Sequence, residues 1–175
     1  MIMRERKKIA IIGGGIAGLT FARSLTNEDY EIHIFEKKES FREIGAAISV
    51  FPNALCVMDD LDLLEEILQN SGQFKTVYLK TSKGKVLSKS EPKSDYPVIC
   101  IHRADLHSIL LKNIEANLYN DFSLKDIAHL DNGQITIQFE NGENREFDAV
   151  IGADGIHSEV RKHIIYDNCA SIKGR

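Results

Sequence analysis

Residues 8–18 read Lys8-Ile9-Ala10-Ile11-Ile12-Gly13-Gly14-Gly15-Ile16-Ala17-Gly18, an apolar run that turns directly into a glycine-rich segment. The apolar run has the character of a buried strand, and apolar residues at helical spacing follow the glycines. The glycines at 13, 15 and 18 match three steric needs: a tight turn, close approach of a phosphate to the backbone, and packing of a helix on a strand. This stretch therefore predicts a strand–turn–helix unit of the dinucleotide-binding type.

An acidic residue, Glu36, ends the next apolar run at residues 31–35, about 20 positions further on, as a βαβ unit requires. A carboxylate there can accept both hydroxyls of an adenosine ribose and would repel a 2′-phosphate. The helix would direct its N–H groups and its positive dipole end at the phosphates. Glycine clusters also form ordinary turns, but the strand, the helix and Glu36 together favour dinucleotide binding.

Composition excludes several other classes of protein. The chain has 175 residues, enough for one domain, and a net charge of −4, which argues against a nucleic-acid partner. It has no apolar run long enough to span a membrane. Its three cysteines form no Cys-x-x-Cys pair, so we expect neither a disulfide framework nor a metal site. These features predict a cytoplasmic globular protein.

Hydrophobic periodicity and turn residues predict the remaining elements. Small and apolar residues at 44–50 would let a bulky group lie against the backbone. The predicted elements are helices at 53–61 and 63–68 joined at Asp62, hairpin strands at 74–81 and 85–88, a strand at 98–101, a helix at 103–118, and strands at 134–140 and 145–151 around Asn141-Gly142.

A second motif follows the last predicted strand: Gly152-Ala153-Asp154-Gly155-Ile156-His157-Ser158-Glu159-Val160-Arg161. It would lie at the carboxyl edge of a parallel sheet, where open α/β folds bind ligands. Asp154 and Ser158 could instead cap a turn and the helix at 159–164. We favour capping for Ser158 and cofactor contact for Asp154.

At this point the sequence resembles the FAD-dependent monooxygenases of the para-hydroxybenzoate hydroxylase type, the class A flavoprotein hydroxylases. That family has the pattern Gly-Ala-Asp-Gly-x-x-Ser-x-x-Arg, matched here at 152–161. It also has a Gly-Ala-x-Ile loop followed by Pro-Asn-Ala-Leu, matched at 45–55, and an Arg-x-x-Leu at a helix start, matched at Arg103 to Leu106. With the glycine fingerprint, four motifs in order cover nearly the whole chain.

The resemblance implies an α/β fold: a Rossmann-like FAD-binding βαβ fold with a parallel central sheet, a β-meander crossover and an incomplete inserted antiparallel sheet of the substrate domain. The expected domains are an FAD-binding part at 1–72, inserted strands at 73–101 and a return to the FAD-binding domain at 102–175. The family also has a Gly-Asp motif in its C-terminal half, followed by small residues and His-Pro. This motif has no match here. We therefore expect an N-terminal portion that alone is inactive, binds FAD poorly and self-associates through exposed sheet.

The family's chemistry implies FAD as cofactor, NADH or NADPH as reductant, and hydroxylation of a small aromatic substrate through a flavin hydroperoxide. Since the cofactor does the chemistry, no side chain is singled out as catalytic. Lys37 and Arg42 could contact adenosine or phosphate or be solvated. Arg103 could contact FAD, pair with Asp105 or lie on the surface. The resemblance and the glycine motif together give these candidate cofactor-binding residues: Gly13, Gly15, Ala17, Gly18, Glu36, Lys37, Arg42, Ala47, Arg103 and Asp154.

Two other functions stay open. The chain could be a truncated non-catalytic nucleotide-binding remnant or a partner subunit. It could also belong to another two-dinucleotide flavoenzyme class, such as the amine oxidases or reductases. The run at 152–161 argues against that class, and a disulfide reductase would also need a redox-active cysteine pair, which the sequence lacks.

Overall fold

The computed structural model describes residues 6–25, 29–41, 46–91 and 93–164. The chain divides into two compact units, one formed by residues 1–41 and 115–175 and the other by residues 42–114. Each unit has its own sheet and core. These limits describe packing, and the functional domains expected at 1–72, 73–101 and 102–175 stay a prediction.

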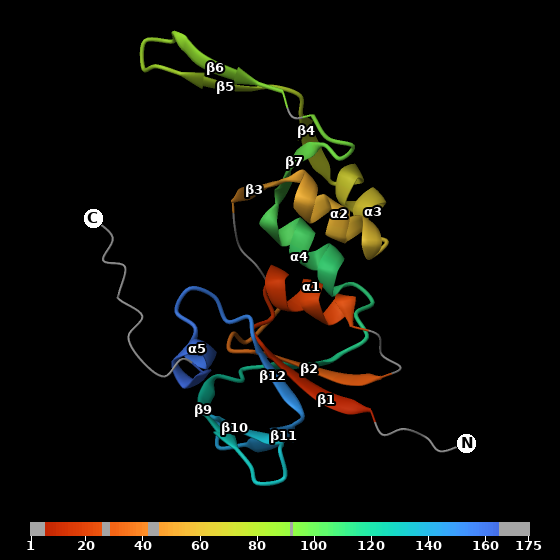
Figure 1. The fold of residues 1–175 in the computed structure, drawn as a ribbon, viewed down its shortest axis with the longest axis vertical. Helices are drawn as coiled ribbons and strands as arrows, with labels where there is room; N and C mark the ends of the chain where they lie inside the picture. The colour runs from red at the N-terminus through yellow and green to blue at the C-terminus, as the bar shows by residue number, and fades with distance from the viewer. Residues whose placement is uncertain (1–5, 26–28, 42–45, 92, 165–175) are drawn as a thin grey trace. The chain divides into compact units, whose positions relative to one another are not determined.

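A four-stranded parallel sheet forms the centre of the first unit. Its strand order is β12 (Ala149–Gly152), β1 (Lys7–Ile12), β2 (Tyr30–Glu36) and β8 (Asn117–Asn120). Helix α1 (Ile16–Ser24) connects β1 to β2 and packs on one face of the sheet through Gly18, Leu19 and Ala22 (Figure 1). This arrangement confirms the predicted βαβ unit and parallel central sheet.

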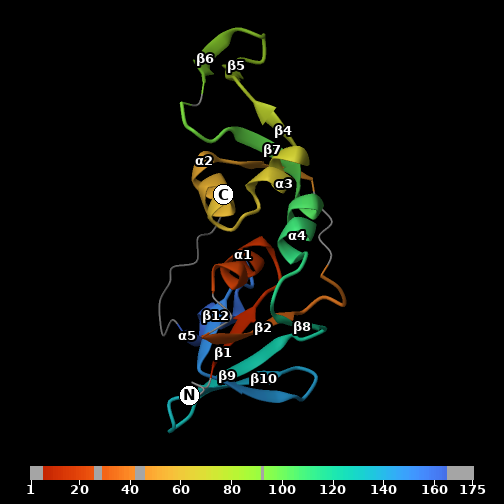
Figure 2. The same ribbon diagram turned by 90° about the vertical axis from the view of Figure 1, so that its right-hand side faces the viewer.

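A three-stranded antiparallel meander covers the other face of the parallel sheet, as both views show (Figures 1 and 2). It consists of β9 (Leu124–His129), β10 (Ile135–Phe139) and β11 (Asn144–Phe147), and α5 (Glu159–Ile164) lies against β9 and β12. Alternation along β1 directs Ala10 and Ile12 toward the meander, where they share a core with Phe35, Ile137, Phe139, Phe147 and Val160. The predicted β-meander is confirmed.

The predicted strand at 145–151 is wrong, because these residues form two strands in two different sheets. The break falls at Asp148, whose N–H donates to the Lys8 carbonyl at 2.9 Å while its carboxylate accepts the Lys8 N–H at 2.7 Å. This pair of hydrogen bonds joins the start of β12 to β1. Apolar alternation continues across the break, so the sequence pattern could not locate it.

The predicted helix at 103–118 is too long. Helix α4 (Arg103–Leu111) ends before Asn113, whose φ of +54° places it in the left-handed region. Leu118 continues the apolar helical spacing, but it lies in β8 with 39% of its surface exposed. Strands β8 and β9 were not predicted, because most of their residues are polar or exposed.

The second unit contains a three-stranded antiparallel sheet, in which β7 (Val98–His102) lies between β3 (Ala47–Val50) and β4 (Ser71–Phe74). Helices α2 (Pro52–Asp60) and α3 (Leu64–Gln69) confirm the two predicted helices, and Asp62, with a φ of +56°, lies at their junction. With α4 these elements bury a core that includes Val50, Leu55, Met58, Ile67, Ile99, Ile101, Leu106 and Leu110.

A two-stranded hairpin of β5 (Val77–Lys80) and β6 (Val86–Ser90) also belongs to the second unit and extends away from its three-stranded sheet (Figures 1 and 2). Every residue of both strands is exposed. The predicted hairpin was too long at its start, because Phe74 pairs with Val98 in the other sheet.

Candidate cofactor-binding site

The carboxyl ends of three parallel strands meet at the glycine turn in the first unit. The Gly13 N–H donates to the Phe35 carbonyl of β2 at 2.8 Å, and the Ala153 N–H after β12 donates to the Ile12 carbonyl of β1 at 2.7 Å. The chain passes from β1 to β2 on one side, whereas β12 lies on the other side of β1. The strand order therefore reverses at β1, and open α/β sheets bind their ligands at the carboxyl ends of the strands at such a reversal.

Two glycines of the fingerprint are required by the packing of this unit. Gly13 has a φ of +109°, and a Cβ on it would meet the backbone of Ala153 and Asp154. A Cβ on Gly18 would meet the Gly13 carbonyl and lie 3.2 Å from Cγ2 of Ile11. Gly13 thus serves the tight turn and Gly18 the close packing of helix on strand, two of the steric needs that the sequence predicts.

Gly15 occupies the N-cap position of α1, where its backbone is extended (φ −79°, ψ −176°) and no side chain caps the helix. Ala17 is the second residue of α1 and is exposed. The first N–H groups of a helix have no acceptor within it, so they can bind an anion such as a pyrophosphate. The first turn of α1 therefore fits the phosphates of a dinucleotide.

Glu36 ends β2 beside this turn, and two backbone N–H groups fix its carboxylate. Oε2 accepts the Gly14 N–H at 2.9 Å, and Oε1 accepts the Lys38 N–H at 3.0 Å. Each carboxylate oxygen can accept more than one hydrogen bond, so both can also receive hydroxyls of a ribose. Lys37 follows directly and is exposed.

Asp154 lies beside Gly13 and caps α5. Its Oδ1 accepts the Ser158 hydroxyl at 2.5 Å, and its Oδ2 accepts the N–H groups of Glu159 and Val160 at 2.7 and 3.2 Å. The Ser158 hydroxyl oxygen in turn accepts the Arg161 N–H at 3.0 Å. The capping role favoured for Ser158 is confirmed, and Asp154 shares it. Contact of Asp154 with a cofactor stays a prediction.

Asp154 is held in its ionised form. Burial acts to raise the pKa of its carboxyl, but the hydrogen bonds from the Ser158 hydroxyl and the backbone amides outweigh burial and lower the pKa below its usual value. The carboxylates of Glu36 and Asp154 thus both lie next to the glycine turn. They suit hydroxyl groups of a ligand, whereas its phosphates suit the N–H groups of α1.

Two other candidate residues lie together in the second unit. Ala47 pairs with His102 across β3 and β7, and the N–H of Arg103, the first residue of α4, donates to the Ala46 carbonyl at 3.4 Å. Arg42 lies outside the described residues. The first unit thus brings together Gly13, Gly15, Ala17, Gly18, Glu36, Lys37 and Asp154.

Three residues that shape this site were not predicted from the sequence. They are Gly14 and Lys38, whose N–H groups orient Glu36, and Phe41, whose ring packs on Gly14. The sequence offered one signal for them: position 14, which can vary in the Gly-x-Gly-x-x-Gly fingerprint, is also a glycine.

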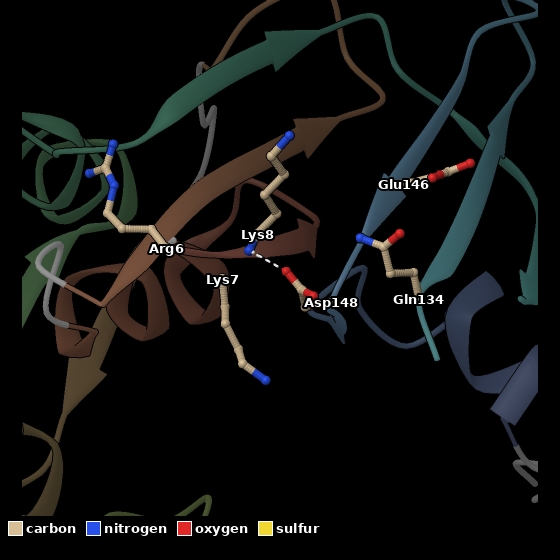
Figure 3. Close-up of a pocket in the computed structure, with 6 residues that line it drawn as sticks. All are labelled: Arg6, Lys7, Lys8, Gln134, Glu146 and Asp148. Carbon is tan, nitrogen blue, oxygen red and sulfur yellow. Dashed lines mark hydrogen bonds between the residues drawn. The ribbon is translucent and has the colours of Figure 1, made fainter. Parts of the chain in front are cut away.

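A cavity of about 340 Å³ lies at the opposite end of the parallel sheet, lined by Arg6, Lys7, Lys8, Gln134, Glu146 and Asp148 (Figure 3). Lys7 and Lys8 are successive strand residues, and their ammonium groups point to opposite sides of β1. The length of β1, about 20 Å, separates this cavity from the glycine turn. Its mixed charges do not converge on one point, so it does not fit a dinucleotide.

Within the described ranges, none of the helices is long and apolar enough to cross a membrane. The same part of the chain contains no group of three or more His, Cys, Asp or Glu side chains placed to hold a metal ion.

A family model described as an FAD binding domain matches residues 6–170. The chain belongs to this FAD binding domain family. The match confirms the predicted resemblance and FAD as the cofactor of the family. It covers both compact units, including the glycine turn, Glu36, Arg103 and Asp154.

Relatives of this FAD binding domain include aromatic monooxygenases. The 3-amino-4-hydroxybenzoate 2-monooxygenase PtmB3 of Streptomyces platensis is 31% identical over 173 residues, which cover 95% of this chain and 44% of that protein. The 6-hydroxynicotinate 3-monooxygenase of Pseudomonas fluorescens is 28% identical over 175 residues, covering 93% and 44%. The chain thus spans less than half the length of these relatives.

Solved structures agree with the assignment. The tetrameric form of 2-methyl-3-hydroxypyridine-5-carboxylic acid oxygenase matches with a TM-score of 0.79 and 28% identity, over 94% of this chain and 43% of that chain. The tetracycline destructase Tet(55) matches with a TM-score of 0.75 and 28% identity, over 95% and 43%. The FAD binding domain therefore has the fold of flavin-dependent oxygenases.

Proposed function

We propose that this chain is the FAD-binding portion of an NAD(P)H-dependent flavin monooxygenase that hydroxylates a small aromatic substrate in the cytoplasm. The observation that carries the proposal is the glycine turn, at which two glycines leave no room for a side chain and Glu36 is fixed by two backbone N–H groups. Two of its relatives are monooxygenases of 3-amino-4-hydroxybenzoate and of 6-hydroxynicotinate, which supports the substrate class.

FAD, when bound, supplies the redox and oxygen chemistry, while the residues of this chain bind and orient it. The first turn of α1, from Gly15 to Gly18, would hold the pyrophosphate with its N–H groups. Glu36 would accept the hydroxyls of the adenosine ribose, with Lys37 beside it. Asp154, ionised at neutral pH, would accept a hydroxyl of the cofactor on the other side of Gly13.

Residues of the second unit and of the connection to it complete the proposal. We assign Arg103 and Arg42 to the anionic parts of FAD, because their guanidinium groups bind phosphates well. Ala47 has a small side chain on an exposed part of β3, which leaves room for the cofactor against the backbone.

Titration of FAD into the 175-residue chain, followed by flavin fluorescence, tests the proposal. We expect binding that is weak, as expected of the chain alone, but saturable. Gly13→Ala should abolish it, and Glu36→Gln should weaken it by about tenfold, the effect of losing charge-assisted hydrogen bonds. Gly133→Ala is the matched control, because Gly133 also has a positive φ but lies in the turn between β9 and β10 with open space around it. Equal binding by the Gly13 and Gly133 variants would contradict the proposal.

The same preparation separates the two functional alternatives. Oxidation of NADH or NADPH after addition of FAD would support a competent reductive half-reaction. FAD binding without any such oxidation is expected both of an N-terminal portion tested alone and of a non-catalytic remnant or partner subunit, so only oxidation discriminates between them.

A further inference from the structure

The aromatic ring of Phe41 occupies the space in which a side chain at position 14 would lie. A Cβ built on Gly14 would meet Cδ1 and Cε1 of this ring and would lie 3.3 Å from Cβ of Glu36. Gly14 itself is buried, and its φ lies outside the left-handed region. Its backbone conformation therefore does not demand glycine, whereas the ring of Phe41 does.

The segment that carries Phe41 is tied to the end of the sheet. The carbonyls of Glu36 and Lys38 accept the N–H groups of Phe122 and Asp121, each at 3.0 Å. The Lys38 N–H donates to Oε1 of Glu36. The residues after β2 are thus fixed to the connection between β8 and β9. A few residues further on, the ring of Phe41 lies against Gly14 in the glycine turn.

Gly14 and Glu36 form the link between this ring and the site. The Gly14 N–H donates to Oε2 of Glu36 at 2.9 Å, and the ring of Phe41 packs against the same glycine. An apolar ring beside a hydrogen bond excludes water and strengthens the bond by lowering the local dielectric constant. The ring of Phe41 and the carboxylate of Glu36 thus meet at the same residue, Gly14.

We propose that Phe41 is a positioning residue for the adenosine end of the site. Its ring covers Gly14, keeps the Gly14 N–H directed at Glu36, and so holds the carboxylate where it receives the ribose hydroxyls. Gly14 and Phe41 form a matched pair, in which the missing side chain of one makes room for the ring of the other. The role in ligand binding rests on the proposed function, but the packing of the pair does not.

A double-mutant cycle without ligand tests the packing. Gly14→Ala should lower the melting temperature by about 5 °C, because its methyl group would overpack against the ring. In a Phe41→Ala background the same substitution should cause no further loss, because the ring is gone. Equal losses in both backgrounds would overturn the matched pair. If Phe41→Ala does not fold, Phe41→Leu, which also removes the ring, replaces it in the cycle.

Binding of ADP and 2′-deoxy-ADP, measured by calorimetry, tests the positioning role. The unmodified chain should prefer ADP by about tenfold, the value of one hydrogen bond to a charged group. Phe41→Leu should bring the ratio close to one, and Phe41→Tyr, which keeps the ring, should restore it. Phe51→Ala, a change at an exposed phenylalanine of the second unit, should leave the ratio unchanged.

The two hypotheses fail in different ways. If the unmodified chain binds neither ADP nor FAD, the proposed function fails, and the positioning role fails with it even if the packing cycle succeeds. If it prefers ADP and Phe41→Leu keeps the full preference, the positioning role is overturned while the proposed function stands.

Discussion

Removing the carboxylate of Asp154 should destabilise the first unit in a pH-dependent way. Asp154 accepts three hydrogen bonds at the start of α5, and loss of such a cap costs about 0.5–2 kcal/mol. Fraying of α5 would also expose Val160, whose burial contributes about 1.5 kcal/mol. Asp154→Ala should therefore lower the free energy of unfolding by about 2 kcal/mol at pH 7, with about 3.5 kcal/mol as the upper bound.

The sign of the pH dependence follows from the lowered pKa of Asp154. Its folded-state pKa lies below its unfolded value, so its contribution is fully present above the ordinary pKa of aspartate and is lost as the pH falls through the folded value. Urea unfolding of the unmodified chain and of Asp154→Ala should be measured from pH 7 down to acid pH. The difference between their free energies of unfolding should shrink below about pH 4.

Asp131→Ala is the control for this comparison, because Asp131 is an exposed aspartate in the turn after β9. It should leave the free energy of unfolding within about 0.5 kcal/mol of the unmodified chain. A variant of Asp154 that is as stable as this control at pH 7, or a loss that stays constant down to pH 3, would refute the capping argument.

Three further predictions concern other parts of the chain. Gly18→Ala should lower the free energy of unfolding by about 1–3 kcal/mol in urea titrations, because the new methyl group would meet the Gly13 carbonyl and force α1 away from β1; an unchanged midpoint would contradict the packing. Burial lowers the pKa of His33 despite its hydrogen bond with Glu31, so the free energy of unfolding should decrease as the pH falls below about 6.5, and His33→Gln should reduce that decrease in urea titrations at pH 7 and 5. The chain should self-associate through the β5–β6 hairpin, where Leu79 and Leu87 are 61% and 60% exposed; replacing both with serine should reduce the sedimentation coefficient at high concentration, whereas Ser88→Ala should not.

The parts of the fold that the sequence predicted depend on local patterns. The glycine turn and the helices around Asp62 follow from steric needs or periodicity among neighbouring residues, and Glu36 follows from its spacing of about 20 positions from the glycines. The break at Asp148 could not be predicted in this way, because it depends on hydrogen bonds to Lys8, 140 positions away along the chain. The same limit applies to Phe41, whose contact with Gly14 exists only once β2 has paired with β1.

The role of Asp154 shows the corresponding limit for function. Its place in a motif shared with flavin enzymes favoured cofactor contact, whereas its hydrogen bonds to Ser158 and to the start of α5 are structural. The two roles are compatible, because a carboxylate that accepts three hydrogen bonds still has a lone pair for a ligand hydroxyl. Capping by Ser158 was predicted from the sequence, whereas the three hydrogen bonds that make Asp154 part of the same cap became evident only in the structure.

The first unit alone contains the groups that would distinguish the parts of an ADP moiety. Phosphates need N–H donors, which the first turn of α1 supplies, and ribose hydroxyls need acceptors, which Glu36 supplies. A phosphate on the ribose would instead face a carboxylate that Gly14 and Lys38 hold in place, so it would be repelled without any opportunity for Glu36 to turn away. Under the proposed function, selection against a 2′-phosphate would therefore depend as much on the backbone donors that fix Glu36 as on the charge of Glu36.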